Sequence, residues 1–514
     1  MGKKILSLKK AVFVAVFMVV FAGFLGILLP NGITASAKGS KAADAIDAKT
    51  KLSVAAKGIY SNWEGVSNVS EFTDAEGNYC YAFYKGKLIT IIKNKKGKAK
   101  SRIKIRMQYP IFGAVTCDPD GYFYVVTGRK NSNGVDMKKN TVFISKYSPT
   151  GSLIATIGDN GSGCFKARYS SYYGYSEMYE DNDSNTKVPF DAGNCDIAVN
   201  GNYIAVNYAR GMYNGHQSNT AIILNRHTMQ FVQLDRYYNS HSFAQRAIPY
   251  QDGFILASEG DAYNRSFSVA FVTPTEEVVP EEEMPKDESW YFSYNTPPYA
   301  YTPLPEAKQQ YTSDHYSRTN SYDIFHFWLQ KNASSNMFLV NNNFAHMGGI
   351  AVADNNHVAL VGTSVKALNK KAAKQKECLF IQIFDPTTDI TKPTGYAISD
   401  TRSGKSGIMG TEDVTDYGIK WLTNGKFNVS NPQVVADHKG RFVILFEKYA
   451  GYSFQGVYYL IVNPDGSIAK KITKFPVSAR LNPCETPKLS GKCIYWTGNK
   501  PGSSSLYTFK LKIK

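Results

Sequence analysis

Several polar side chains with the capacity for proton transfer or sugar recognition stand beside short apolar runs of the sequence. One set precedes such runs and comprises Asn194, His241, His346, Asn431 and Asn482. A second set lies within or after them and comprises Arg210, His216, Arg246, Glu259, Asp261 and Arg265. Imidazoles beside carboxylates and guanidinium groups suit acid–base work, and they also suit an acidic or sugar ligand. Taken singly, such residues more often satisfy hydrogen bonds at strand ends, so any chemistry requires the fold to bring them together. In an enzyme, His241 and His346 would be the acid–base pair, with Arg246 or Arg210 as the anion clamp.

A second pattern places a basic residue at every second position of one segment. Its members are Lys98, Lys100, Arg102, Lys104 and Arg106. In a strand, all five side chains point to the same face. The stripe could be an outer strand that is charged to prevent pairing of its edge, or a wall for an anionic polymer. We expect no nucleic acid, because no aromatic side chains alternate with the charges to stack on bases.

Standard cofactor and metal motifs are absent: neither H-E-x-x-H nor G-x-S-x-G occurs. Asp181, Asp183 and Asn185 have the first three ligand spacings of a calcium loop, but Thr186 and Ala192 replace the glycine and the closing glutamate. We therefore expect a solvated loop there, with calcium as the alternative, and we predict no other metal and no cofactor.

The elements that must position these residues are revealed by a repeat, a tight turn followed by a short apolar strand. Its seven copies contain YCYAFY, YFYVVTG, NYIAVNYA, FILASEG, HVALVGTS, RFVILFEK and KCIYWTG. Most begin with Asn-Gly, Asp-Gly or a related pair, which supplies the positive φ angles of a hairpin turn. The strand after the turn is apolar on both faces, which is typical of a strand covered on both sides.

Most copies continue with a strand, a polar turn and another strand, giving the four strands of a propeller blade. We predict an all-β chain with a single seven-bladed β-propeller of four-stranded blades, interrupted by long loop insertions. The insertions fall at about 158–190, 273–342, 365–377 and 395–429. The seventh copy lacks its outermost strand, so we expect an N-terminal segment at about 51–60 to close the ring.

The first 37 residues read as a targeting segment. Four lysines precede an uncharged apolar run at residues 11–29, and Ala35-Ser36-Ala37 fits a signal-peptidase site. An uncleaved membrane anchor is the alternative, because 19 apolar residues can span a bilayer. We thus expect a signal peptide or anchor at 1–37, a linker at 38–50 and the propeller at 51–514, exported to the cell surface or the medium.

The formal net charge is +17. A basic exported protein could meet anionic wall polymers or acidic polysaccharides, although charge alone also serves solubility. The seven cysteines contain no C-x-x-C pair. Cys484 and Cys493 flank a turn and could form a disulfide, while buried free thiols are the alternative.

The segments DPDGYFYVVTG and NPDGSIAKKI resemble those of bacterial exported seven-bladed propellers of the NHL and YVTN kind. The resemblance covers roughly residues 52–514 and rests on generic blade motifs, so it implies the fold and no activity. There is no Trp-Asp dipeptide and no Ser-x-Asp-x-Gly-x-Thr-Trp box, which excludes the WD40 and sialidase signatures.

Three functions remain open at this point. We favour a non-enzymatic binding module that takes a polysaccharide, a wall polymer or a protein at the channel mouth, where aromatic insertions around Trp290 would form platforms. The first alternative is a lyase, hydrolase or transferase acting at the same mouth through the acid–base pair. The second alternative is a scaffold in a surface assembly.

Overall fold

The computed structural model describes most of the chain from Ala43 to Ile513. The described ranges are 43–51, 68–95, 98–131, 136–161, 166–170, 176–180, 185–191, 193–234, 242–260, 266–274, 310–311, 316–326, 345–366, 374–386, 419–503 and 505–513. The regular elements in these ranges are β-strands. Residues 1–42, and with them the expected targeting segment, lie outside the described residues.

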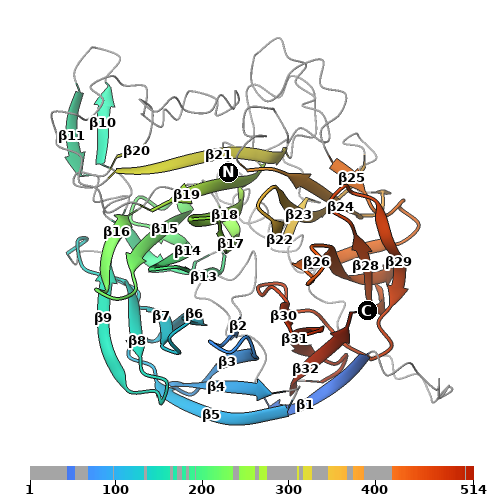
Figure 1. Ribbon diagram of the computed structural model, residues 1–514. Helices are drawn as coiled ribbons and strands as arrows, with labels where there is room; N and C mark the ends of the chain where they lie inside the picture. The colour runs from blue at the N-terminus through green and yellow to red at the C-terminus, as the bar shows by residue number, and fades with distance from the viewer. Residues whose placement is uncertain are drawn as a thin grey trace, which may run out of the picture. The chain divides into compact units, whose positions relative to one another are not determined.

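Seven antiparallel sheets, or blades, stand in a ring (Figure 1), so the chain is a single seven-bladed β-propeller. Blade 1 contains β2 (Val69–Thr73), β3 (Tyr79–Lys85), β4 (Leu88–Lys95) and β5 (Lys98–Arg106). Blade 2 contains β6 (Ile111–Cys117), β7 (Phe123–Gly128), β8 (Val142–Tyr147) and β9 (Leu153–Asp159). Blade 3 contains β12 (Thr186–Pro189), β13 (Cys195–Asn200), β14 (Tyr203–Met212), β15 (Gln217–Asn225) and β16 (Gln230–Leu234). Blade 4 contains β17 (Ser242–Tyr250), β18 (Gly253–Gly260), β19 (Ser266–Thr273), β20 (Gln310–Tyr311) and β21 (Tyr316–His326).

The last three blades complete the ring. Blade 5 contains β22 (His346–Asp354), β23 (His357–Ser364), β24 (Cys378–Phe384) and β25 (Ile419–Trp421). Blade 6 contains β26 (Asn428–Ala436), β27 (Phe442–Ala450), β28 (Ser453–Val462) and β29 (Ile468–Lys474). Blade 7 contains β30 (Lys488–Ser490), β31 (Cys493–Asn499), β32 (Ser505–Lys512) and β1 (Ala43–Lys51). Figure 1 shows β2, β6, β13, β17, β22, β26 and β30 toward the centre of the ring, and β5, β9, β16, β21, β25, β29 and β1 at its perimeter.

The two ends of the chain close the ring within blade 7. Strand β1 pairs antiparallel with β32, with Ala43 opposite Leu511 and Lys51 opposite Ser505. An N-terminal strand therefore closes the propeller, as the sequence predicts. The strand lies earlier than the expected segment at 51–60, within the stretch expected to be a linker. Closure removes the open edge that β32 would otherwise present.

Three of the expected insertions contribute strands to blades. In blade 4, β19 pairs with β21, which comes from within the expected insertion at 273–342. In blade 5, β24 pairs with the three-residue strand β25, which lies within the expected insertion at 395–429. The expected insertion at 158–190 contains the separate hairpin of β10 (Lys166–Ser170) and β11 (Ser176–Glu180) as well as β12.

The turns between the first two strands explain part of the repeat. Gly121 and Gly440 have φ angles of 87° and 68°, a region that glycine enters without a steric penalty. The turn of blade 4 differs, because Gln251 has the positive φ angle. Glycine is required at position 253 because a side chain there would collide with strand β19. A Cβ atom on Gly253 would lie 2.1 Å from the carbonyl oxygen of Val272.

The hydrophobic core is divided among the spaces between neighbouring blades. Each of the seven junctions holds one buried cluster. Strand β7 shows why the second strands are apolar on both faces: Phe123 packs toward blade 1 and Tyr124 toward blade 3. The repeat of apolar runs therefore follows from a repeat of covered strands.

Cys484 and Cys493 are both free thiols, so the disulfide considered from the sequence does not form. The other described cysteines, Cys80, Cys117, Cys195 and Cys378, are buried and free as well.

In the described part of the chain, no helix has the length and apolar character needed to cross a membrane.

Candidate functional site

Glu259 and His346 lie together at the junction of blades 4 and 5. Glu259 is the penultimate residue of β18, and His346 begins the innermost strand of blade 5. The Nδ1 atom of His346 is 3.8 Å from Oε1 of Glu259. The other carboxylate oxygen, Oε2, accepts a 2.6 Å hydrogen bond from the backbone N–H of Met347. The fold therefore brings together two candidates that are far apart in the sequence.

His346 has an unusual combination of exposure and desolvation. Its side chain is 49% exposed, whereas that of Glu259 is 7% exposed. Burial nevertheless lowers the pKa of His346 below its usual value. Protein atoms close to the ring therefore disfavour its charged form, while part of the ring still reaches water. The lowered pKa favours the neutral imidazole, which can both donate and accept a hydrogen bond.

Arg246, which the sequence suggests as an anion clamp, is a strut across the centre of the ring. Its guanidinium group donates to the carbonyl oxygens of Gln245, Gly348 and Pro483, at 2.7, 2.6 and 2.9 Å. These acceptors belong to blade 4, blade 5 and the segment before β30 of blade 7. The side chain is 2% exposed, and only its Nε atom lacks a hydrogen-bond partner. The guanidinium group is thus largely occupied by carbonyl groups of the protein.

Asn194 is a connector between blades 3 and 4. Its backbone N–H and side-chain amide contact Gln245 at 3.0 Å, and its Oδ1 accepts a 2.7 Å bond from the Gln245 backbone. Both residues are buried. These hydrogen bonds of Asn194 therefore link the innermost strands of blades 3 and 4.

Arg210 and His216 lie in blade 3, in different surroundings. Arg210 is fully buried and donates from Nε to Oγ of Ser218 at 3.0 Å. Its Nη1 lies 3.4 Å from Oγ1 of Thr186, so the guanidinium group joins β14 to β15 and β12. His216 is exposed in the turn between β14 and β15.

Asn431 belongs to a buried anchor between blades 6 and 7. It adopts a left-handed conformation with a φ angle of 49°, at a point where the register of β26 shifts. Its side chain hydrogen bonds to Glu447, which also accepts from the backbone N–H of Leu481 at 2.9 Å. Arg480 is 3.3 Å from the same carboxylate. Burial raises the pKa of Glu447, and the charge of Arg480 opposes this rise. Asn431 thus has a role in packing the blades.

A group of carboxylates toward the centre of the ring went unrecognised in the sequence. Thr497 donates to Oε1 of Glu71 from its backbone N–H and its hydroxyl, at 2.9 and 2.6 Å, and so ties blade 7 to blade 1. Burial raises the pKa of Glu71 to about 7. Glu485 accepts a 2.8 Å bond from the Glu71 backbone, and burial with the charges of Glu71 and Asp196 raises its pKa well above normal. The one available signal was an acidic residue inside an apolar strand, VSEFT.

Most of the remaining candidates lie outside the described residues. These are His241, Asp261, Arg265, Asp181, Asp183 and Trp290. Asn185, the third residue of the calcium pattern, is buried and donates to the Met137 carbonyl oxygen at 3.2 Å. In the described ranges, no group of three or more His, Cys, Asp or Glu side chains is placed to hold a metal ion.

The basic stripe lies on β5, at the perimeter of blade 1. Four members are exposed: Lys100, Arg102, Lys104 and Arg106. The alternating residues Ile103 and Ile105 are partly and fully buried against the core between blades 1 and 2. The stripe is therefore remote in the topology from the innermost strands that carry Asn194, Arg246 and His346.

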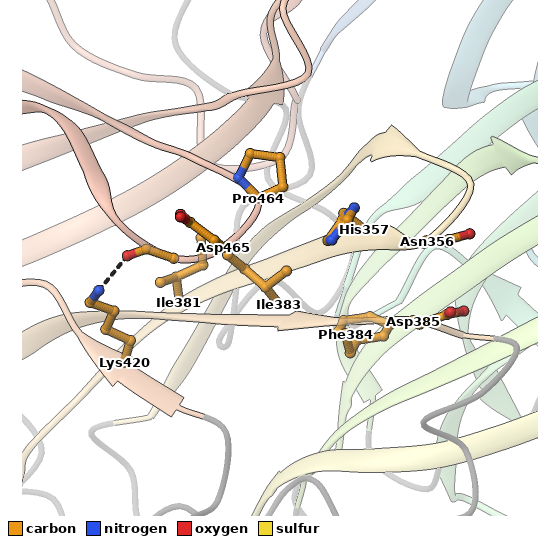
Figure 2. A pocket seen from close by; sticks show the side chains of 10 residues that line it. Asn356, His357, Ile381, Ile383, Phe384, Asp385, Lys420, Pro464 and Asp465 are labelled. Atoms are coloured by element: carbon orange, nitrogen blue, oxygen red, sulfur yellow. Dashed lines mark hydrogen bonds between the residues drawn. The ribbon is translucent and has the colours of Figure 1, made fainter.

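A pocket between blades 5 and 6 was not anticipated from the sequence (Figure 2). Its cavity volume is about 490 Å³, within the range of small-molecule sites. Strand β24 runs along its base, with Ile381 and Ile383 between Lys420 and His357. Asp465 lines it from the turn before β29. The sequence marks these stretches only as blade turns, and it does not show that the turns of two blades meet.

Polar groups at the rim of this pocket are partly tied to the protein. The Nζ atom of Lys420 donates to the carbonyl oxygen of Gly466, shown as a dashed line in Figure 2. The Nδ1 atom of His357 is 2.8 Å from Oδ1 of Asp354, which fixes the ring. The pocket thus offers an apolar base with carboxylate and imidazole groups around it.

Comparisons with known proteins assign no family and no activity to the chain, and the propeller fold rests on its own strand topology. No protein-family model matches the sequence, and no curated protein matches it. Among solved structures, the chain is similar to polysaccharide lyase Uly1, with a TM-score of 0.41, 8% identity and coverage of 87% of this chain and 90% of that one. It is also similar to Trypanosoma rangeli sialidase in complex with the inhibitor DANA, with a TM-score of 0.32, 9% identity and coverage of 80% and 58%. A chain of a mitotic checkpoint complex is similar with a TM-score of 0.38 and 9% identity, and the match covers 95% of this chain and 100% of that one.

Proposed function

We propose that the chain is an exported binding module that takes a hydroxylated ligand, such as a polysaccharide, at the end of the propeller channel beside His346 and Glu259. The observation that carries this proposal is the state of His346. It is half exposed and desolvated, and it faces a nearly buried carboxylate at 3.8 Å. Other candidates are less available, because the hydrogen-bonding groups of Asn194 and most of those of Arg246 are occupied by the protein.

The chemistry of the pair supports a hydroxylated ligand. A neutral imidazole offers one donor and one acceptor, and a carboxylate offers acceptors, so together they complement sugar hydroxyl groups. A propeller suits such a role, because its channel end is a rigid site framed by several blades. Export through residues 1–37 belongs to the proposal and places the ligand outside the cytoplasm.

The same pair supports a second candidate function, an enzyme that uses His346 as a general base. A lowered pKa keeps the imidazole unprotonated near neutral pH, which a base requires. The nearby carboxylate of Glu259 could orient the ring and stabilise the imidazolium ion formed after proton abstraction. The two functions differ in outcome, because an enzyme changes the ligand that it captures.

A glycan and wall-polymer array with the purified protein tests the proposal. We expect capture of a defined saccharide that survives physiological salt, and a loss of affinity of about tenfold or more in His346→Gln and Glu259→Gln. The matched control is His357→Gln, which removes another partly exposed histidine with a carboxylate partner, on the pocket between blades 5 and 6. Equal capture by wild type and both channel-end variants would exclude the site. Mass spectrometry of the captured glycan separates binding from turnover.

A further inference from the structure

Blade 1 contains a stretch of the chain that carries positive charges and no negative ones. From Gly77 to Cys117 the sequence contains ten basic residues and no acidic residue. The C-terminal stretch from Gly466 to Lys514 also has ten basic residues, with one acidic residue among them. The arrangement of the charge in blade 1, and not its amount, therefore distinguishes this stretch.

Strand β5 arranges part of this charge in a line. Arg102, Lys104 and Arg106 are exposed and share one face of the strand, because side chains alternate between faces. Lys100 is also exposed and lies at a register shift of β5 against β4, between Ala99 and Ser101. Arg102, Lys104 and Arg106 follow one another at roughly 6.7 Å, since a strand rises by about 3.3–3.4 Å per residue. We refer to these four residues as the basic stripe.

The basic stripe has no counter-charge on its neighbouring strand. The residues opposite Arg102, Lys104 and Arg106 on β4 are Ile92, Thr90 and Leu88. Within the described part of the chain, no ion pair involves any of the four stripe residues. Leu88 is itself 41% exposed, so the surface beside the stripe stays open to solvent.

The outer strand of blade 6 is an exposed edge strand whose positive charges do not form a row on one face. On β29, Lys470 and Lys471 are adjacent and point to opposite faces, and exposed Ile468 and Ile472 interrupt the charge. The Nζ atom of Lys470 lies 5.5 Å from the ring centroid of Tyr459. Protection of an edge therefore does not need a row of exposed cations on one face.

We propose that the basic stripe of β5 binds a linear polyanion whose carboxylate or phosphate groups repeat along the chain. Arginine and lysine are suited to these groups, and the two guanidinium forks can engage them bidentately. A line of charge on a strand matches an extended polymer better than a compact anion. The stripe contains no aromatic side chain for base stacking, so an acidic polysaccharide or polyphosphate fits better than a nucleic acid.

This site is distinct from the channel end in the proposed function. The stripe lies on the outermost strand of blade 1, whereas His346 begins the innermost strand of blade 5. Polyanion binding can therefore succeed or fail independently of a saccharide at the channel end. A propeller with both sites would hold on to an anionic matrix at its perimeter while its channel end samples other ligands.

A competing structural role comes from β1, which contacts β5 across the junction of blades 7 and 1. The sequence of β1 contains Asp44 and Asp47. If the stripe served to hold the closing strand, its removal would weaken the ring closure. A stability measurement on each variant therefore belongs to the experiment.

The test compares two triple variants by isothermal titration calorimetry with polygalacturonate and with polyphosphate, in 20 mM and 150 mM NaCl. The first is Lys100→Gln, Arg102→Gln and Lys104→Gln. The control is Lys470→Gln, Lys471→Gln and Lys474→Gln, which removes the same charge from the outer strand β29. We expect at least a tenfold loss of affinity and a flatter salt dependence in the first variant, and less than a threefold loss in the control.

Each outcome bears on the proposal. Binding of polygalacturonate alone supports a carboxylate polymer, binding of polyphosphate alone supports a phosphate polymer, and binding of both supports recognition of charge spacing. Equal losses in the two variants would show a net-charge effect and overturn the proposal. It also fails if the first variant binds like wild type, if neither polymer binds wild type at low salt, or if a 20-nucleotide poly(dT) binds more tightly than both polymers. If the first variant loses binding and its thermal unfolding midpoint also falls by several degrees, the stripe is assigned to ring closure instead.

Discussion

The junctions between blades 4 and 5 and between blades 6 and 7 share one arrangement of a glutamate and a backbone amide, and they differ in the side chains around it. In each, a glutamate on the second strand, Glu259 or Glu447, accepts a hydrogen bond from a backbone amide of the next blade. The side chain that precedes this amide faces the same carboxylate. It is His346 at one junction and Arg480 at the other.

We call the closed network around Glu447 the lock and, after the proposed function, the Glu259–His346 pair the site. Arg480 is permanently charged, lies 3.3 Å from Glu447 and donates to the hydroxyl of Tyr449 at 2.8 Å. Tyr449 donates in turn to the same carboxylate, which completes a closed network. His346 is farther from its glutamate, at 3.8 Å, more exposed and titratable. Under the proposed function, His346 leaves the Glu259 junction available for a ligand, whereas Arg480 and Tyr449 occupy Glu447.

Arg246 connects the two junctions across the ring. Its guanidinium group binds the carbonyl oxygen of Gly348, two residues after His346, and that of Pro483, three residues after Arg480. The geometry of both junctions therefore depends on one buried side chain. The comparison leads to four predictions, which run from the largest expected effect to the smallest.

The largest effect is expected from breaking the lock with Glu447→Ala. The change leaves the Leu481 amide without its acceptor and removes the counter-charge of Arg480, at a site that is fully buried. We expect a loss of about 3–5 kcal/mol in the free energy of unfolding. Urea unfolding measures it, with Glu259→Ala as the matched variant at the open junction. A smaller loss in Glu447→Ala than in Glu259→Ala would reverse our assignment of lock and site.

The second prediction concerns the strut that joins the junctions. Arg246→Met keeps much of the side-chain volume and removes charged hydrogen bonds to three carbonyl groups. We expect a loss of about 2–3 kcal/mol in the free energy of unfolding. We also expect weaker ligand capture at the channel end, because Gly348 and His346 belong to the same strand. If the unfolding midpoint in urea does not change, Arg246 is not a strut.

The third prediction uses a junction where the glutamate lies on the first strand, between blades 7 and 1. The pKa of Glu71 is raised from 4.5 to about 7, so the folded state holds its proton more tightly than the unfolded state does. The stabilising contribution is complete below pH 4.5 and is lost as the pH rises through 7. The span of 2.5 units corresponds to roughly 3 kcal/mol as an upper limit.

Glu71→Gln tests this directly, because the amide oxygen can still accept the hydrogen bonds from Thr497. We expect the variant to lose less stability than wild type between pH 5 and pH 8, as measured by urea unfolding across that range. Parallel pH profiles for the two proteins would show that Glu71 titrates normally in the folded state.

The smallest effect on stability is expected from converting the site into a lock with His346→Arg. A partly exposed ion pair contributes about 1 kcal/mol or less, so we expect only a slight rise in the free energy of unfolding. Ligand capture at the channel end should fall by about tenfold or more, because a neutral donor and acceptor is replaced by a cation that pairs with Glu259. Unchanged capture would mean that the imidazole of His346 does not contact the ligand. Calorimetry with the array ligand measures the affinity, and urea unfolding measures the stability.

The candidate site was only partly predictable from the sequence. His346 and Glu259 were chosen for their types and for their places beside apolar runs, and the structure brings them within 3.8 Å. Asn194 and Arg246 were chosen on the same grounds and prove to bind other blades. The pattern is the same for a ligand-facing group and a blade connector, because both place a polar side chain at a strand end.

By itself, the sequence determined the blade and the number of blades. Turns such as Asp120-Gly121 and apolar strands such as FVILF are set by local φ preferences and by burial on two faces, which each repeat records independently. The sequence also determined the line of charge on β5, since alternation within one strand is a local property. Only the tertiary structure decided which strand closes the ring, where the insertions return as β21 and β25, and which polar side chains meet. Those outcomes depend on contacts between residues far apart in the chain, and a single strand carries no record of its neighbour's side chains.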